Sequence, residues 1–258
     1  MDLDWLFHPF RHRARAGLLA APFPPAWLPL VEPLPFYRAL DARGQQRIRD
    51  DLRVLVAEKA WEGCGGLVLT DEIRVTIAAT ASLLLLDIEH DYYPQVRTIL
   101  VYPRAWRKPA EMDAFGNVRE ASANLGEAWS SGQVVLAWDA AQRGVRDPHD
   151  GHNVVLHEFA HQLDLLDGAA NGAPPLRGND YCRQWQTTMA AEFATLQRAA
   201  AGGRATLLDA YGATNPAEFF AVATECFFER SRRLAERHPQ LYEVLRAFSG
   251  QDPAGRSG

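Results

Sequence analysis

Residues 154–164 read Val-Val-Leu-His-Glu-Phe-Ala-His-Gln-Leu-Asp, and their apolar positions predict a buried helix. We expect this helix to run over about 152–166 and to end at Gly168. Each residue advances about 100° around a helix, so His157 and His161 lie about 40° apart on one face. Burying both rings is costly without a polar partner, and a metal ion within reach of both supplies one.

Glu158 completes the H-E-x-x-H pattern between the two histidines. Its side chain is offset from the histidine face, where it accepts a proton from an attacking water and later returns it to the leaving amine. A structural zinc needs no such group, so the pattern favours a catalytic zinc over a structural one. The plain alternative is a partly exposed helix with ordinary polar residues, because H-E-x-x-H also occurs by chance.

A catalytic zinc needs a third protein ligand. Asp167 stands where the extended form of the motif places one, but that geometry requires a glycine at the position of Asp164, which makes Asp167 a poor choice. A second segment, residues 211–221, predicts a helix capped at 214–215, with Glu218 in its first turn. Glu225 and Glu229 fall on roughly the same face of that helix, so spacing leaves all three glutamates open.

Two blocks of the sequence resemble a known family. The first is His157-Glu158-Phe159-Ala160-His161-Gln162-Leu163-Asp164, followed by Asp167-Gly168 and Asn171-Gly172. The second is Tyr211-Gly212-Ala213-Thr214-Asn215-Pro216-Ala217-Glu218-Phe219-Phe220-Ala221-Val222. Together they resemble Mlc titration factor A, a bacterial family of zinc peptidases. The second block is also similar to the metal-site segment of anthrax-type lethal factor peptidases.

The resemblance implies a role for each matching residue. Glu218 becomes the third ligand of one zinc ion, in the two-histidine, one-glutamate class (gluzincins). Tyr211 matches a tyrosine whose hydroxyl stabilises the oxyanion, the alternative being an ordinary loop aromatic. Asp164 orients a ligand as an outer carboxylate or is an exposed aspartate at a helix end. The strand 133–138 holds the substrate antiparallel by main-chain pairing, although the residues alone predict only a core strand.

The leading functional hypothesis is a zinc metallopeptidase, with an aminopeptidase preference implied by the family. The runner-up is an anti-repressor, because the family is associated with binding the glucose-responsive repressor Mlc and relieving repression of sugar-uptake genes. In that reading the zinc site is secondary. The expected partners are therefore a peptide or protein substrate and Mlc.

Composition excludes other classes of function. The 258 residues carry a net charge of −5, which leaves no basic face for nucleic acid. The longest apolar run, 75–86, is too short to span a bilayer, and no export signal precedes it. Three widely spaced cysteines predict buried, reduced thiols. We therefore expect a cytoplasmic monomer.

The order of the elements predicts an α+β, zincin-like metallopeptidase core, mostly helical with a small mixed sheet beside the H-E-x-x-H helix. We expect a single domain over 1–258, or two packed subdomains of about 1–150 and 151–258 with the active site between them. Residues 1–37 are expected to be extended, with the basic cluster at 11–15 in a solvated turn. Further helices are expected over 41–59, 70–86, 180–198, 216–232 and 239–249, strands over 96–102 and 133–138, and a long loop over 103–132.

Overall fold

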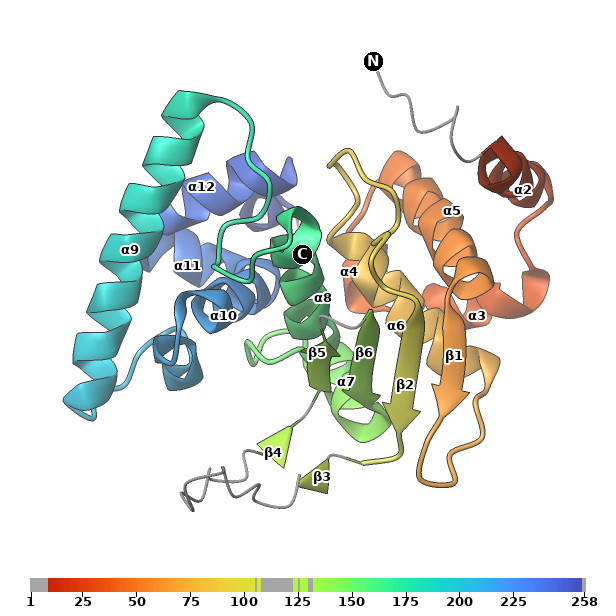
Figure 1. Ribbon diagram of the computed structural model, residues 1–258, viewed down its shortest axis with the longest axis horizontal. Helices are drawn as coiled ribbons and strands as arrows, with labels where there is room; N and C mark the ends of the chain where they lie inside the picture. The colour runs from red at the N-terminus through yellow and green to blue at the C-terminus, as the bar shows by residue number, and fades with distance from the viewer. Residues whose placement is uncertain (1–8, 105, 108–122, 125, 130–131, 257–258) are drawn as a thin grey trace.

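A small mixed sheet forms the centre of one half of the molecule (Figure 1). The computed structural model describes residues 9–104, 106–107, 123–124, 126–129 and 132–256. The sheet order is β1-β2-β6-β5, in which β1, β2 and β6 are parallel and β5 is antiparallel to β6. The strands are β1 (Ala60–Gly63), β2 (Thr98–Tyr102), β5 (Gly126–Trp129) and β6 (Gln133–Ala137); β3 (Trp106–Arg107) and β4 (Ala123–Asn124) pair separately. The α+β class predicted from the sequence is confirmed.

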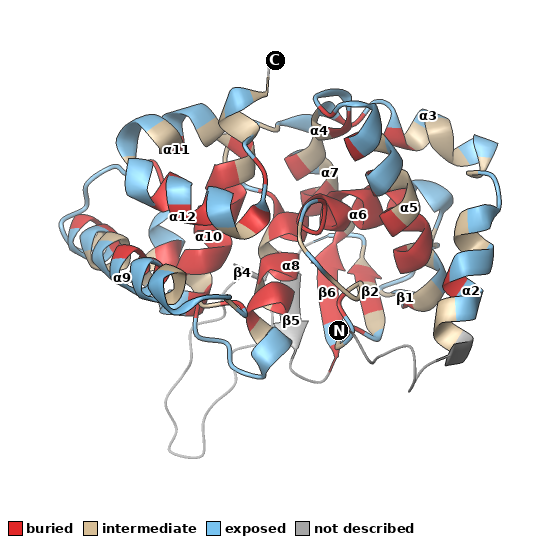
Figure 2. Cartoon of the chain, turned by 90° about the horizontal axis from the view of Figure 1, so that it is seen from above, coloured by how far each residue is buried: buried red, intermediate tan, exposed pale blue. Residues whose placement is uncertain are grey.

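Helix α8 (Val154–Asp164) is the helix of the H-E-x-x-H motif and lies at the centre of the fold (Figures 1 and 2). It contacts β5 and β6 on one side and α10 (Pro216–Glu229) on the other, and α6 (Asp71–Leu83) also packs against it. Figure 2 shows that α6, α8 and α10 are largely buried. The remaining helices are α2 (Pro9–Ala20), α3 (Leu28–Val31), α4 (Pro35–Arg38), α5 (Ala42–Glu58), α7 (Trp138–Arg146), α9 (Asn179–Ala201), α11 (Ser231–Arg237) and α12 (Pro239–Ser249), with 3-10 turns η1 (Pro25–Trp27), η2 (Leu165–Asp167), η3 (Ala210–Ala213) and η4 (Pro253–Gly255).

Most of the predicted elements are present, and the differences are local. The helix expected over 216–232 breaks at Arg230 into α10 and α11. Helix α7 follows β6 directly and was not predicted. The segment 103–132, expected to be a loop, contains β5 as well as β3 and β4. Strand β6 is buried and has a partner strand on both sides, so it is the core strand that the residues predict and not a free edge.

The N-terminal segment differs most from expectation. Residues 9–20 form α2 instead of an extended strap, and short helices follow over 25–31 and 35–38. Pro25, Pro29 and Pro35 occupy first-turn positions of those short helices, where their fixed φ is compatible with helix and their missing N–H is not needed. Arg15 is nearly buried and pairs with Glu58 and Asp91, so the basic cluster is not a solvated turn.

The three cysteines are free, but only Cys226 is buried, whereas Cys64 and Cys182 are half-buried. The expectation of buried thiols is therefore correct for one of the three. Among the described residues, no helix is both long and apolar enough to cross a membrane.

Candidate metal centre

Two capped helix starts position the two motif histidines and Glu218. Asn153 caps α8 because its side chain accepts a hydrogen bond from the amide of Leu156 at 3.2 Å. Asn215 caps α10 in the same way, accepting from the amide of Glu218 at 2.9 Å. Because α8 packs against α10, these two helix starts fix the position of Glu218 relative to the histidine face of α8.

Three ligand atoms converge between α8 and α10. The Nε2 atom of His157 lies 3.0 Å from Oε2 of Glu218 and 3.2 Å from Nε2 of His161, and the third side of the triangle is 3.3 Å. Ligand atoms at the corners of a tetrahedron, about 2.0–2.1 Å from a central zinc ion, stand about 3.3–3.4 Å apart. The donor set and its spacing therefore fit a tetrahedral metal ion. Among the described residues, these three form the group able to hold one.

Glu225 holds His157 from behind. Its Oε1 atom lies 2.7 Å from Nδ1 of the ring, and its Oε2 atom accepts a hydrogen bond from the backbone N–H of Asn153. A carboxylate accepts hydrogen bonds, so the ring proton resides on Nδ1 and the Nε2 lone pair is left for a metal. Glu225 is thus the outer partner of a ligand and lies outside the triangle of ligand atoms.

The electrostatics of the cluster favour a cation. Burial of the His157 ring opposes its protonation, yet the hydrogen bonds to Glu218 and Glu225 outweigh burial and raise the pKa of His157 to about 10. Burial acts to raise the pKa of Glu218, but its hydrogen bonds to the two histidines outweigh burial and hold that pKa well below its usual range. A divalent cation supplies the positive charge that these carboxylates attract in place of a ring proton.

Glu158 and Tyr211 flank the ligands. Glu158 is buried on α8, and its charge contributes to the raised pKa of His157. Tyr211 lies on η3, its ring centroid 6.1 Å from that of His157, and 49% of the residue is exposed. Asp209 fixes the start of η3, since its carboxylate accepts the amide N–H of Tyr211 at 2.7 Å and lies 3.6 Å from the ring of His152. The tyrosine therefore lies beside His157 and is partly exposed to solvent.

Asp164 holds the loop that follows α8. It is fully buried, and its two oxygens accept the backbone N–H groups of Gly172 and Ala173, each at 2.8 Å. Of the two alternatives for Asp164, the exposed helix-end aspartate is wrong, because the loop folds back over the carboxylate. Gly172 in turn packs so tightly that a Cβ atom there would lie 2.3 Å from the carbonyl oxygen of Pro216. Asp167, by contrast, is exposed and bonds to the amide of Ala169.

Comparison with known proteins identifies the family of this chain. The family model described as glucose-regulated metallo-peptidase M90 matches residues 10–249. The chain belongs to the M90 metallopeptidase family. Among similar proteins, an uncharacterized protein of Synechocystis sp. is 43% identical over 241 residues, covering 92% of this chain and 87% of the relative. Mlc titration factor A of Serratia proteamaculans is 34% identical over 252 residues, covering 95% and 92%.

A more distant relative, Mlc titration factor A of Yersinia pestis, is 29% identical over 261 residues, covering 98% of this chain and 92% of the relative. The M90 assignment agrees with the resemblance found in the two sequence blocks around His157 and Glu218. Membership of a metallopeptidase family and a His/Glu group with metal-ligand spacing together indicate a metal ion at the triangle.

Sequence reasoning missed the residues that hold the candidate metal ligands from behind. Spacing left Glu225 and Glu229 open as ligands, whereas the structure places Glu225 at Nδ1 of His157 and Glu229 at the side-chain amide of Asn153, 3.1 Å away. Asn153 was recognisable only as a residue near a helix start. Its second role, donating its backbone N–H to Glu225, depends on the packing of α8 against α10.

Proposed function

We propose that this M90 metallopeptidase family member is a zinc-dependent peptidase whose single zinc ion is held by His157, His161 and Glu218. The supporting observation is the triangle of ligand atoms with sides of 3.0, 3.2 and 3.3 Å. Two imidazole nitrogens and one carboxylate oxygen are a donor set typical of catalytic zinc, which keeps its remaining position for water or substrate. Zinc is favoured over calcium or magnesium because those ions prefer oxygen ligands.

The surrounding side chains have separate roles in the proposed reaction. Zinc, when bound, supplies a Lewis acid and lowers the pKa of a coordinated water towards neutrality. Glu158 accepts the proton of the attacking water and passes it to the leaving amine nitrogen. The hydroxyl of Tyr211 donates a hydrogen bond to the oxyanion that develops from the scissile carbonyl. Glu225 keeps the ring of His157 in one tautomer and orientation throughout.

The proposed substrate is a peptide that binds in extended form along β5. This strand ends the sheet order, pairs with β6 on one side and contacts α8. A peptide added antiparallel to β5 would extend the sheet by main-chain hydrogen bonds beside the motif helix. We also propose that the enzyme prefers substrates with a free N-terminus, as an aminopeptidase does, because the family resemblance implies this preference.

Digestion of an unbiased peptide library tests this proposal. Zinc-loaded protein is expected to cleave peptides, and Glu158→Gln is expected to retain zinc while losing at least about 100-fold in cleavage rate, because general acid–base catalysis contributes on this scale. Blocking the peptide N-termini by acetylation tests the aminopeptidase preference, which predicts that cleavage is lost. Cleavage by Glu158→Gln at the wild-type rate would refute the catalytic assignment.

A second candidate function is that of a cytoplasmic anti-repressor that binds Mlc. It is favoured by the name of the Serratia and Yersinia relatives, Mlc titration factor A. The C-terminal helix α12 is a poor candidate for the binding surface, because Tyr242 and Leu245 are buried in the core and Arg246 pairs with Glu243. Titration of purified Mlc with wild type and with Glu158→Gln separates the two functions: equal binding without any cleavage of peptides supports the anti-repressor.

A further inference from the structure

A cavity of about 700 Å³ lies at the opposite end of α10 from Glu218. Its walls come from α4, α6, the end of α7, the start of α8 and the junction of α10 with α11. Phe36, Leu83, Leu156 and Phe228 give it an apolar interior. A volume of this size accommodates a small organic molecule.

The polar lining of the cavity is strongly positive. Arg230, Arg232 and Arg233 line it, and none of the three forms a salt bridge with another residue in the part of the chain that the structure describes. Arg256 lines it too, but also lines a neighbouring pocket that holds Asp41 and Asp87. The side chains of Arg232 and Arg233 are exposed and form no hydrogen bond within the described residues, whereas the side chain of Arg230 donates to the backbone oxygens of His149 and Leu207. In a chain of net charge −5, this local excess of cations attracts an anion.

Glu229 is the acidic residue in the lining and does not neutralise the arginines. Only 8% of it is exposed, one oxygen accepts from the side chain of Asn153 at 3.1 Å, and the other is buried without a hydrogen-bond partner among the described residues. Burial is the main cause that raises the pKa of Glu229 to about 8, with further contributions from the nearby charges of Asp150 and Glu225. Near neutral pH its carboxyl group is therefore largely protonated and available as a hydrogen-bond donor.

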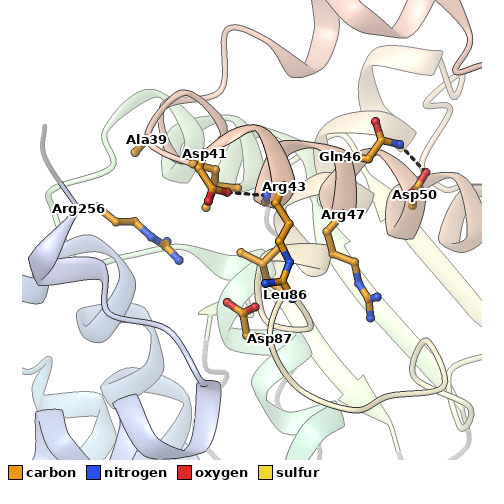
Figure 3. A pocket seen from close by; sticks show the side chains of 11 residues that line it. Ala39, Asp41, Arg43, Gln46, Arg47, Asp50, Leu86, Asp87 and Arg256 are labelled. Atoms are coloured by element: carbon orange, nitrogen blue, oxygen red, sulfur yellow. Dashed lines mark hydrogen bonds between the residues drawn. The ribbon is translucent and has the colours of Figure 1, made fainter.

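A neighbouring pocket of about 670 Å³ differs from this cavity in the charge of its lining (Figure 3). Acidic and basic side chains both line it: Asp41, Asp50 and Asp87 stand among Arg43, Arg47 and Arg256. Its charges balance, and two of its carboxylates already accept hydrogen bonds from the protein: Asp50 from the side chain of Gln46 at 2.9 Å and Asp41 from the amide of Gly44 at 2.8 Å. That pocket offers no preference for either sign of charge, whereas the cavity beside Glu229 does.

The cavity is connected to the metal group through Asn153. Asn153 lines the cavity, caps α8 and holds Glu229 with its side chain, while its backbone N–H donates to Glu225. Glu225 in turn holds Nδ1 of His157. A ligand that changes the position of Asn153 or Glu229 therefore alters the support of a metal-binding histidine.

We propose that this cavity is a binding site for a small organic acid with an apolar body, and that its occupation is coupled to metal binding through Asn153 and Glu225. The acid group pairs with Arg232 and Arg233 at the rim, because a guanidinium binds carboxylates and phosphates through paired N–H donors. The apolar body fills the interior beside Phe36 and Phe228. Binding of the acid is independent of the proposed peptidase function, whereas the coupling rests on its metal site.

Calorimetric titration of the full chain tests the binding. 4-Phenylbutyrate is expected to saturate one site, and its neutral amide and butyrate are expected to bind at least about tenfold more weakly, for lack of the charge and of the apolar body respectively. Phenyl phosphate is titrated as a second anion. Whichever of 4-phenylbutyrate and phenyl phosphate has the lower dissociation constant identifies the preferred acid group, carboxylate or phosphate. The double variant Arg232→Ala, Arg233→Ala should bind 4-phenylbutyrate at least about tenfold more weakly than wild type. Arg237→Ala, on the same helix but outside the cavity, should leave its affinity unchanged.

Equal affinity for 4-phenylbutyrate and its amide, or no loss in the double arginine variant, would overturn the proposal. Coupling is tested by repeating the titration with zinc-loaded and metal-free protein. Linkage requires the acid and zinc to change each other's affinity by the same factor, and a change of at least about threefold is expected. Identical acid affinities in the zinc-loaded and metal-free proteins would overturn the coupling. A chain that binds no zinc would refute the proposed peptidase function, but the titration with 4-phenylbutyrate would still test the acid site.

Discussion

Glu225 gives the sharpest test of how the metal group is supported. Its carboxylate accepts two N–H donors at once, from Nδ1 of His157 at 2.7 Å and from the backbone of Asn153. Glu225→Gln keeps the shape of the side chain but replaces one acceptor oxygen with an NH₂ group. That group would face one of the two donors, so one hydrogen bond is lost and a donor is left buried without an acceptor.

The expected loss is large enough to measure. Removing the outer partner of a metal-binding histidine typically costs about 10–100-fold in metal affinity. That range corresponds to about 1.4–2.7 kcal/mol, similar to the value of one hydrogen bond to a charged group. We therefore expect the zinc dissociation constant of Glu225→Gln to be about 10–100 times that of wild type.

Competition with a chromogenic zinc chelator measures this dissociation constant. Glu236→Gln, on the exposed face of α11, changes the net charge equally and should bind zinc as wild type does. Thermal unfolding of the metal-free proteins checks that Glu225→Gln still folds. A zinc affinity within twofold of wild type in the folded variant would show that the contact between Glu225 and His157 does not support the metal group.

Three further predictions concern stability. Asp164→Ala leaves the amides of Gly172 and Ala173 without their acceptors and should lower the free energy of unfolding by about 2–4 kcal/mol in urea titrations; a loss below about 1 kcal/mol contradicts this. Gly172→Ala combines a φ of +78° with a Cβ clash against Pro216, so its melting temperature should fall, and an unchanged value would show that the loop yields freely. Burial raises the folded-state pKa of Glu229 from its ordinary 4.5 to about 8, so wild-type stability should fall as pH rises through that window, by up to about 1.4 kcal/mol per unit. Glu229→Gln removes the contribution of this carboxyl group to the pH dependence of the unfolding free energy. Parallel curves of stability against pH for the two proteins from pH 5 to 8.5 would refute the prediction.

Local spacing was sufficient for the parts of the site that lie on one helix. His157 and His161 are one helical turn apart, so the 3.6-residue repeat places both on one face of α8 whatever the rest of the chain does. Glu218 required the resemblance of a second block, because spacing left three glutamates of one helix open. The structure separates Glu218 from Glu225 by the packing of α8 on α10, which no local pattern encodes.

The errors have physical causes of the same kind. Prolines in the first 37 residues suggested extended chain, but proline is equally compatible with the first turn of a helix, as at Pro25 and Pro35. Strand β5 was not predicted because its sequence has no strong strand pattern, and its pairing with β6 depends on the rest of the sheet. The burial of Asp164 depends on a loop that returns to α8 eight residues later.

The metal content and coordination of the purified protein test the central claim most directly. Elemental analysis with X-ray absorption at the zinc edge should find one zinc ion per chain, bound by two imidazole nitrogens and oxygen, without sulfur. Glu218→Ala should lose most of this zinc, whereas Glu236→Ala should retain it. A sulfur ligand at the zinc, or full zinc content in Glu218→Ala, would contradict the proposed site.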